Sequence, residues 1–142
     1  MTRDFLVRSA VAAVLSFLAC GAAAPADQFP FDQELLLDAA PMRPGKRMPI
    51  LTVELNGNAK IDLWCKAVSA RLEISDTAMK IEVGPLPEGL PEMMSAGQCT
   101  PERIKADEEL LADFTQVSTW RRQGEGVLLE GAKTLKFRAS DH

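Results

Sequence analysis

Short apolar stretches separated by turn-forming residues run along most of the chain. Within several stretches the apolar positions recur at every second residue, which is the period of a strand with one buried face. This pattern predicts strands at residues 34–39, 49–55, 59–64, 68–74, 79–83, 117–122, 127–130 and 134–138. The chain is therefore predicted to be mainly β.

Turn residues indicate how neighbouring strands are connected. Residues 56–58 read Asn-Gly-Asn between two apolar runs, and because Asn and Gly tolerate positive φ, this is a strong hairpin signal. Asp76-Thr77 predicts a second turn. In the strand that follows the first turn, Ile61, Leu63 and Cys65 share one face, so we expect Cys65 to point inward.

One helix is predicted after a long loop at residues 84–97, where three prolines exclude a central strand. Thr100 suits the N-cap, Pro101 the first helical position and Glu102 the positive helix end. Helical spacing gives an apolar stripe, whereas we expect the acidic side chains to face outward. The stripe comprises Ile104, Ala106, Leu110, Leu111 and Phe114; the acidic residues are Asp107, Glu108, Glu109 and Asp113.

Together these elements predict an α+β, mainly β fold. We expect a compact antiparallel sheet or a partly closed barrel, with the one helix packed against it.

The N-terminus has the three parts of a signal peptide. Arg3 and Arg8 precede an apolar run at residues 10–20, and small residues follow up to Ala26. The run is shorter than the roughly 20 residues that span a bilayer. We therefore predict a signal peptide at residues 1–26, cleaved after Ala26, and a single periplasmic or secreted domain at residues 27–142 with no transmembrane segment.

Lipidation at Cys20 is the alternative, because this cysteine lies where a lipid-modified cysteine would lie. The leucine of the usual small-residue box is displaced by one position, to Leu18. A lipoprotein anchored at Cys20 therefore stays open beside the released form.

Removing the leader changes the cysteine count from three to two, Cys65 and Cys99. In an oxidising compartment a lone pair of cysteines usually forms a disulfide. Closing a loop of about 35 residues should stabilise the fold by about 4 kcal/mol on the chain-entropy model. The alternative is two buried free thiols.

Most enzyme chemistries lack their residues. The one histidine is His142, the last residue, so Ser–His and Cys–His nucleophile systems and histidine-ligated zinc are not expected. No glycine-rich phosphate loop is present. The net charge of −4 gives no electrostatic footprint for nucleic acid. We expect no enzyme activity, no cofactor, no metal and no nucleic-acid partner.

A few residues remain as candidates, each with a structural interpretation beside the functional one. Asp62 could act as a carboxylate but should face solvent, and the acidic helix residues are expected to be a solvated face. The basic turn could contact an anion or a partner, or simply be solvated. The methionines could bind a soft metal, although their spacing is irregular. The tryptophans could stack on a ligand or pack in the core. These residues are Arg43, Lys46 and Arg47; Met42, Met48, Met79, Met93 and Met94; and Trp64 and Trp120.

From Ile61 onward the order of features resembles a known family. A cysteine ends an early strand, and a second cysteine, Cys99, is followed at once by the acidic helix and three final strands. This order is similar to that of the META-domain family, HslJ-like heat-shock proteins. The family usually reads Gly-Cys-Asn and Thr-x-Met-Ala-Cys at the two cysteines. Here Trp-Cys-Lys at 64–66 and Ala-Gly-Gln-Cys at 96–99 depart from both, so the resemblance rests on order and spacing.

The resemblance implies a compact antiparallel β fold with one helix, association with the cell envelope and a part in stress or antimicrobial tolerance. It implies no catalytic residues. We therefore expect an exported, non-enzymatic envelope domain that binds a protein partner or a small apolar ligand. One alternative is a protease-inhibitor-like protein whose free segment at residues 27–30 enters a cleft. A second is a carboxylate-dependent enzyme, which requires a carboxyl group of raised pKa in a concave site.

Overall fold

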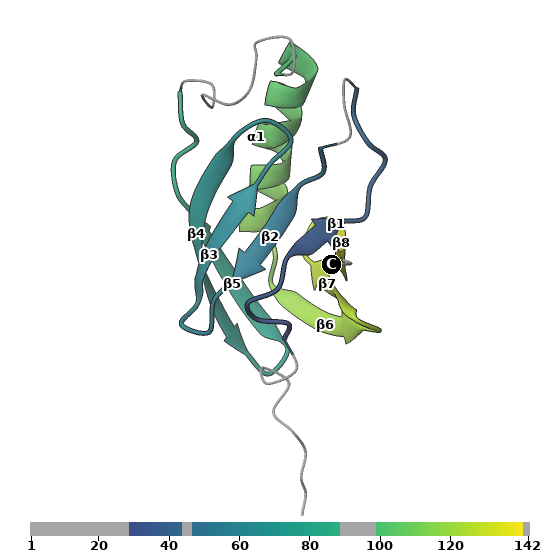
Figure 1. Cartoon of the computed structure of the whole chain (residues 1–142). Coiled ribbons are helices and arrows are strands. Elements are labelled where there is room, and N and C mark those ends of the chain that lie inside the picture. Colours follow the sequence, from purple (N-terminus) through teal and green to yellow (C-terminus); the bar gives the residue numbers. More distant parts are fainter. Residues whose placement is uncertain (1–28, 44–46, 89–98, 141–142) are drawn as a thin grey trace, which may run out of the picture.

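Eight antiparallel strands close into a barrel, and one helix lies between the fifth and sixth strands (Figure 1). The structure is a computed structural model and describes residues 29–43, 47–88 and 99–140. The elements are β1 (Leu35–Leu37), β2 (Ile50–Val53), β3 (Asn58–Asp62), β4 (Ala67–Ser75), β5 (Ala78–Val83), α1 (Pro101–Thr115), β6 (Thr119–Gln123), β7 (Gly126–Glu130) and β8 (Thr134–Ala139). Over these described residues, the predicted mainly β fold with one helix is confirmed.

The barrel is fully closed, whereas the sequence predicted a compact antiparallel sheet or a partly closed barrel. Closure comes from β1, which pairs with β8 over three residue pairs, Leu35 with Ala139 to Leu37 with Phe137. The junction of β5 and β6 is the shortest, because Ala78 and Thr119 are its one register pair. The helix α1 connects these two strands and packs against β5.

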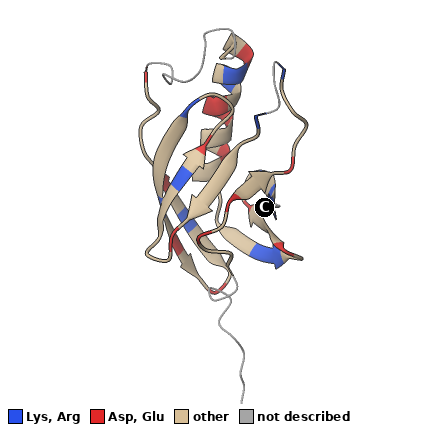
Figure 2. Cartoon of the chain, in the orientation of Figure 1, with Lys and Arg blue, Asp and Glu red and all other residues tan. Residues whose placement is uncertain are grey.

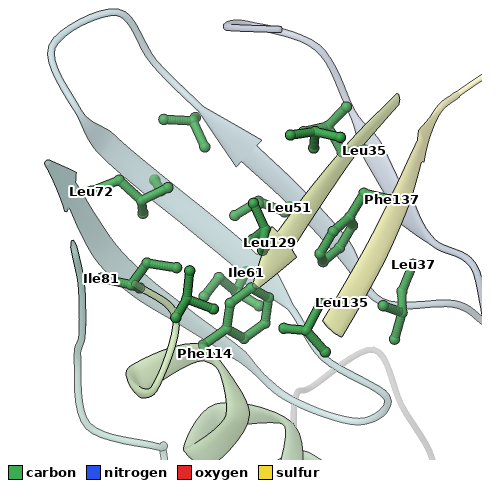
Figure 3. Packing of buried hydrophobic residues seen from close by; sticks show 14 of the residues in the cluster. Leu35, Leu37, Leu51, Ile61, Leu72, Ile81, Phe114, Leu129, Leu135 and Phe137 are labelled. Atoms are coloured by element: carbon green, nitrogen blue, oxygen red, sulfur yellow. The ribbon is translucent and has the colours of Figure 1, made fainter. Parts of the chain in front are cut away.

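Alternate side chains from the strands fill the interior of the barrel (Figure 3). Leu35, Leu51, Ile61 and Leu129 have no exposed surface, and Phe114 points from α1 into the same cluster. Each such side chain contributes about 1.5–3 kcal/mol through its burial. The barrel is therefore a packed core, as in other small barrels.

The hairpin predicted at residues 56–58 joins β2 to β3. Gly57 has φ +92°, and a Cβ atom there would lie 2.6 Å from the carbonyl oxygen of Leu72, so glycine is required for both reasons. The second predicted turn, at Asp76-Thr77, joins β4 to β5. The hairpin places Leu55 and Asn56 at one end of the barrel.

The helix begins as predicted but presents a different face to the barrel. The Thr100 side chain accepts a hydrogen bond from the backbone N–H of Arg103 at 3.3 Å. Leu110 and Phe114 are buried, as expected. The prediction that Asp107 faces outward is wrong, since Asp107 has no exposed surface. Ile104, Ala106 and Leu111, expected in the buried stripe, are only partly buried.

Several predictions fall on residues outside the described ranges. These are the signal peptide at 1–26 with its cleavage site and Cys20, and also Lys46, Met93, Met94 and His142. Within the described ranges, no helix is long and apolar enough to cross a membrane.

Candidate functional site: the two ends of the barrel

The Cys65–Cys99 disulfide predicted from the cysteine count is present, with 2.07 Å between the two sulfur atoms. Cys65 lies in the connection between β3 and β4, and Cys99 directly precedes the N-cap of α1. Both residues are buried. The bridge therefore fastens the start of the helix to the β3–β4 connection.

Asp107 fastens the same connection from the second turn of the helix. Its Oδ1 and Oδ2 atoms accept hydrogen bonds from the backbone N–H of Cys65 at 3.1 and 3.2 Å, and Oδ2 also accepts one from the N–H of Lys66 at 2.8 Å. Consecutive backbone N–H groups that converge in this way form an anion-binding nest. Here the anion is a carboxylate of the protein itself.

Three cationic side chains at this end of the barrel each bind the backbone of another segment, and the charge of one of them, Arg47, acts on Asp107. The Lys66 ammonium donates to the carbonyl oxygens of Pro87 and Glu88, and the Arg47 guanidinium donates to Leu63 at 3.0 Å. Arg103 donates to the carbonyl oxygen of Met42 at 2.6 Å. We call Arg47, Lys66, Arg103 and Asp107 the charge cluster; it links the β1–β2 loop, the β5–α1 loop, α1 and the β3–β4 connection.

Burial raises the pKa of Asp107 above its ordinary value, and this effect outweighs the others. The backbone N–H groups of Lys66, Cys65 and Trp64 and the charge of Arg47 act in the opposite direction. A raised carboxyl pKa was one requirement of the enzyme alternative. Asp107, however, is fully buried with both oxygens on backbone donors, and it lines none of the surface hollows described below. Its arrangement supports a structural role.

The opposite end of the barrel carries two apolar side chains, Phe31 and Leu55, that reach solvent among polar neighbours such as Asp32 and Arg71. Two hollows, of about 580 and 280 Å³, share Phe31 and Leu55 in their linings. Among the described residues Leu55 is the one strongly exposed large apolar side chain, at 76%. We call Phe31 and Leu55 with the two hollows the Phe31–Leu55 surface. It lies at the β2–β3 turn, and Arg122 from β6 borders the larger hollow.

An aromatic stack supports this surface from beneath. The ring centroid of Phe29 lies 5.3 Å from that of Trp120 in an edge-to-face arrangement, and 5.1 Å from that of Phe31. Phe29 and Trp120 are buried, whereas Phe31 is partly exposed. The half-exposed ring of Phe31 is therefore held in place by buried neighbours.

A third hollow, of about 300 Å³, lies between α1 and the strands β1 and β8. Its floor is apolar and includes Trp64 and Leu110. Two ion pairs border it, Lys133 with Asp113 at 3.9 Å and Lys136 with Asp38 at 3.6 Å. Its rim charges are thus partly paired with one another.

The other predicted candidates have structural explanations. Asp62 is half-buried and forms an ion pair with Lys60 at 3.5 Å. Trp64 and Trp120 are buried in the core, as their structural interpretation predicted. Met42 and Met48 pack against the core, and Met79 is part of it. Within the described ranges, no three His, Cys, Asp or Glu side chains are grouped as metal ligands.

The two described arginines of the basic turn at residues 43–47 lie in different environments. Arg43 is exposed, but Arg47 is half-buried and bound to the backbone, so it is not the solvated side chain that the structural interpretation assumed. Elsewhere the charges are mixed: Figure 2 shows acidic and basic residues interspersed along the strands and loops.

Comparison of the chain with protein-family models, with curated proteins and with solved structures gives no match in any of the three. The META-domain resemblance therefore stays a prediction from the order and spacing of its features. What this chain does has to be argued from its own residues.

Proposed function

We propose that this protein is an exported, non-enzymatic domain of the cell envelope that binds a protein partner through the Phe31–Leu55 surface. The observation that carries the proposal is the exposure of Leu55, at 76%, beside Phe31 and two hollows.

Single exposed apolar residues are common and need no explanation by themselves. Leu55 differs because it adjoins a second apolar side chain, Phe31, and two concave regions. The hairpin turn itself depends on Gly57 and on Asn56, whose side chain accepts a hydrogen bond from Asn58. Nothing in the turn requires a leucine at position 55, so its exposure beside Phe31 and the two hollows supports a contact role.

A protein partner suits this surface better than the small apolar ligand that the sequence also allowed. Barrels that hold a small ligand keep space for it inside. In this barrel Leu51, Ile61 and Leu129 occupy the interior with no exposed surface. The hollows of the Phe31–Leu55 surface lie instead outside the strands, at the end of the barrel, where a partner's side chains can enter.

Two arguments support the envelope location. The predicted signal peptide directs the chain out of the cytoplasm. The Cys65–Cys99 disulfide fits an oxidising compartment. A contact function in the envelope also agrees with what the META-domain resemblance implies.

The protease-inhibitor alternative is not favoured by a specific observation. Its free segment was to comprise residues 27–30, but Phe29 and Pro30 are buried. Phe29 packs edge-to-face on Trp120. That half of the segment is therefore part of the core and cannot reach into a cleft.

The test is affinity capture from envelope extract with the oxidised mature domain and two variants. Leu55→Ser removes the apolar anchor, and Glu108→Ser changes an exposed helix residue as the matched control. We expect one partner to be retained by the wild-type protein and by Glu108→Ser, and lost with Leu55→Ser. Circular dichroism confirms that all three are folded. Retention of the same proteins by all three would contradict the proposal.

A further inference from the structure

The disulfide is closed to reductants in the folded protein. Cys65 has no exposed surface and Cys99 is only 5% exposed. Reduction requires a thiolate to reach one of the two sulfur atoms. Part of the structure must therefore move before the bond can be cleaved.

The contacts of α1 indicate which part moves. The first half of the helix is fastened by the covalent disulfide at Cys99 and by two polar contacts, the Arg103 guanidinium on Met42 and the Asp107 carboxylate on residues 65–66. The second half is fastened by apolar packing of Leu110 and Phe114 in the core. Polar contacts can open locally while the apolar half stays in place.

We propose that Asp107 controls access to the Cys65–Cys99 disulfide, and that reduction unlocks the first half of α1 while the second half stays packed. The bond becomes reachable when the Asp107 carboxylate releases the N–H groups of Cys65 and Lys66. This device lies at the end of the barrel opposite the Phe31–Leu55 surface and does not depend on the proposed partner.

The reductant is a dithiol. Its thiolate attacks one sulfur atom, the Cys65–Cys99 bond breaks, and the second cysteine leaves as a thiolate that takes up a proton. The second thiol of the dithiol then resolves the mixed disulfide. Two electrons and two protons end on the protein as two thiols, and the dithiol becomes a cyclic disulfide.

The first test is the rate of reduction by dithiothreitol without denaturant, at one fixed pH. Asp107→Asn replaces one acceptor oxygen by an NH2 group, which donates and cannot accept, and we expect reduction to accelerate about tenfold or more. Glu108→Gln, an exposed neighbour on the same helix, should leave the rate unchanged. Equal rates for Asp107→Asn and the wild-type protein would overturn the proposal.

A second control separates local opening from a general loss of stability. Val53→Ala removes buried volume on β2. Val53 pairs with Ala59 at the start of β3, far from Cys65, which follows the end of that strand. The reduction rate of each variant is plotted against its free energy of unfolding. If the disulfide is exposed by local opening, Val53→Ala should accelerate reduction less than Asp107→Asn for the same loss of stability. If the two variants follow one relation between rate and stability, reduction occurs through global unfolding and the proposal fails.

The second test needs no variant at Asp107. Amide hydrogen exchange is measured on the oxidised and the reduced wild-type protein. We expect the amides near Ile104 and Asp107 to lose protection on reduction, and those near Leu111 and Phe114 to keep it. Equal loss in both halves, or no loss in either, would contradict the predicted division of the helix.

Discussion

The two ends of this barrel differ in what they bury and what they expose. At the end with the β3–β4 connection, charged groups are withdrawn from solvent: Arg103 is 1% and Asp107 0% exposed. At the end with the β2–β3 turn, the apolar side chain of Leu55 is left in solvent. Each end thus contains an exception to the usual distribution, buried charges at one and an exposed leucine at the other.

The difference separates two kinds of contribution. Removing a buried carboxylate that binds the backbone destabilises the fold, because the backbone N–H donors are left without an acceptor. An exposed leucine has few contacts within the fold, so its removal changes stability little. We therefore expect substitutions at the charge cluster to act on stability, and those at the Phe31–Leu55 surface to act on binding.

The largest effect is expected from removing the disulfide. Cys65→Ser combined with Cys99→Ser should lower the free energy of unfolding by about 4 kcal/mol, since the bridge closes a loop of 34 residues. Denaturant titration of the variant and of the oxidised wild-type protein measures this difference. A change below about 1 kcal/mol, the size of an average substitution, would mean that this end is not the stabilising one.

The next effect is expected at Asp107. Asp107→Ala leaves the N–H groups of Cys65 and Lys66 without their acceptor and should lower the free energy of unfolding by about 3 kcal/mol. Glu108→Ala, on the exposed side of the same helix turn, should change it by less than about 0.5 kcal/mol. Similar losses in both variants would show that the carboxylate contacts contribute nothing beyond the helix itself.

A smaller effect is expected from pH, with a sign fixed by the raised pKa of Asp107. The folded protein binds the Asp107 proton more tightly than the unfolded chain does. The contribution of Asp107 to the free energy of unfolding is therefore fully present below the pKa that this carboxyl group has in the unfolded chain. It is lost as the pH rises through the folded pKa. The stability of the wild-type protein relative to Asp107→Asn should therefore decrease as the pH is raised from the acidic range toward neutrality. Denaturant titrations across a pH series measure the trend, and an increase would contradict it.

The smallest change in stability is expected at the exposed end. Leu55→Ser should alter the free energy of unfolding by less than about 0.5 kcal/mol, even though we expect it to abolish partner binding. Thermal unfolding measures the first effect and affinity capture the second. A large loss of stability would show that Leu55 belongs to the fold rather than to an interface.

The sequence was sufficient for features that depend on local pattern. The Asn-Gly turn and the N-cap at Thr100 follow from neighbouring residues, and the structure contains both. Cys65 is buried as expected, but it lies in the β3–β4 connection, where residues 63–66 are all buried and strand alternation does not apply. The disulfide was predicted from the two cysteines that remain outside the predicted signal peptide. Barrel closure could not be predicted in this way, because the pairing of β1 with β8 joins residues at opposite ends of the domain.

Asp107 was assigned to the wrong face, although helical spacing held the information. Positions 103, 107, 110 and 114 recur every three or four residues, so Asp107 shares a face with Leu110 and Phe114. The prediction gave residue type more weight than spacing. What the sequence could not supply is the set of N–H groups at residues 65–66, which come from a distant connection and make the burial of this carboxylate possible.

The Phe31–Leu55 surface was missed for a different reason. Phe31 precedes β1 and Leu55 follows β2, and neither lies in a motif. Both residues line the same two hollows, and these hollows exist only in the folded barrel. The one available signal was an apolar residue directly before the Asn-Gly turn, which was counted as part of a strand.

Site-specific photo-crosslinking tests the contrast between the ends most directly. A photoreactive phenylalanine analogue is placed at position 55 in one sample and at position 108 in another, and the oxidised domain is irradiated in envelope extract. We predict a discrete crosslinked partner from position 55 and none from position 108. The same product from both positions, or a product from position 108 alone, would contradict the assignment of partner contact to the Leu55 end.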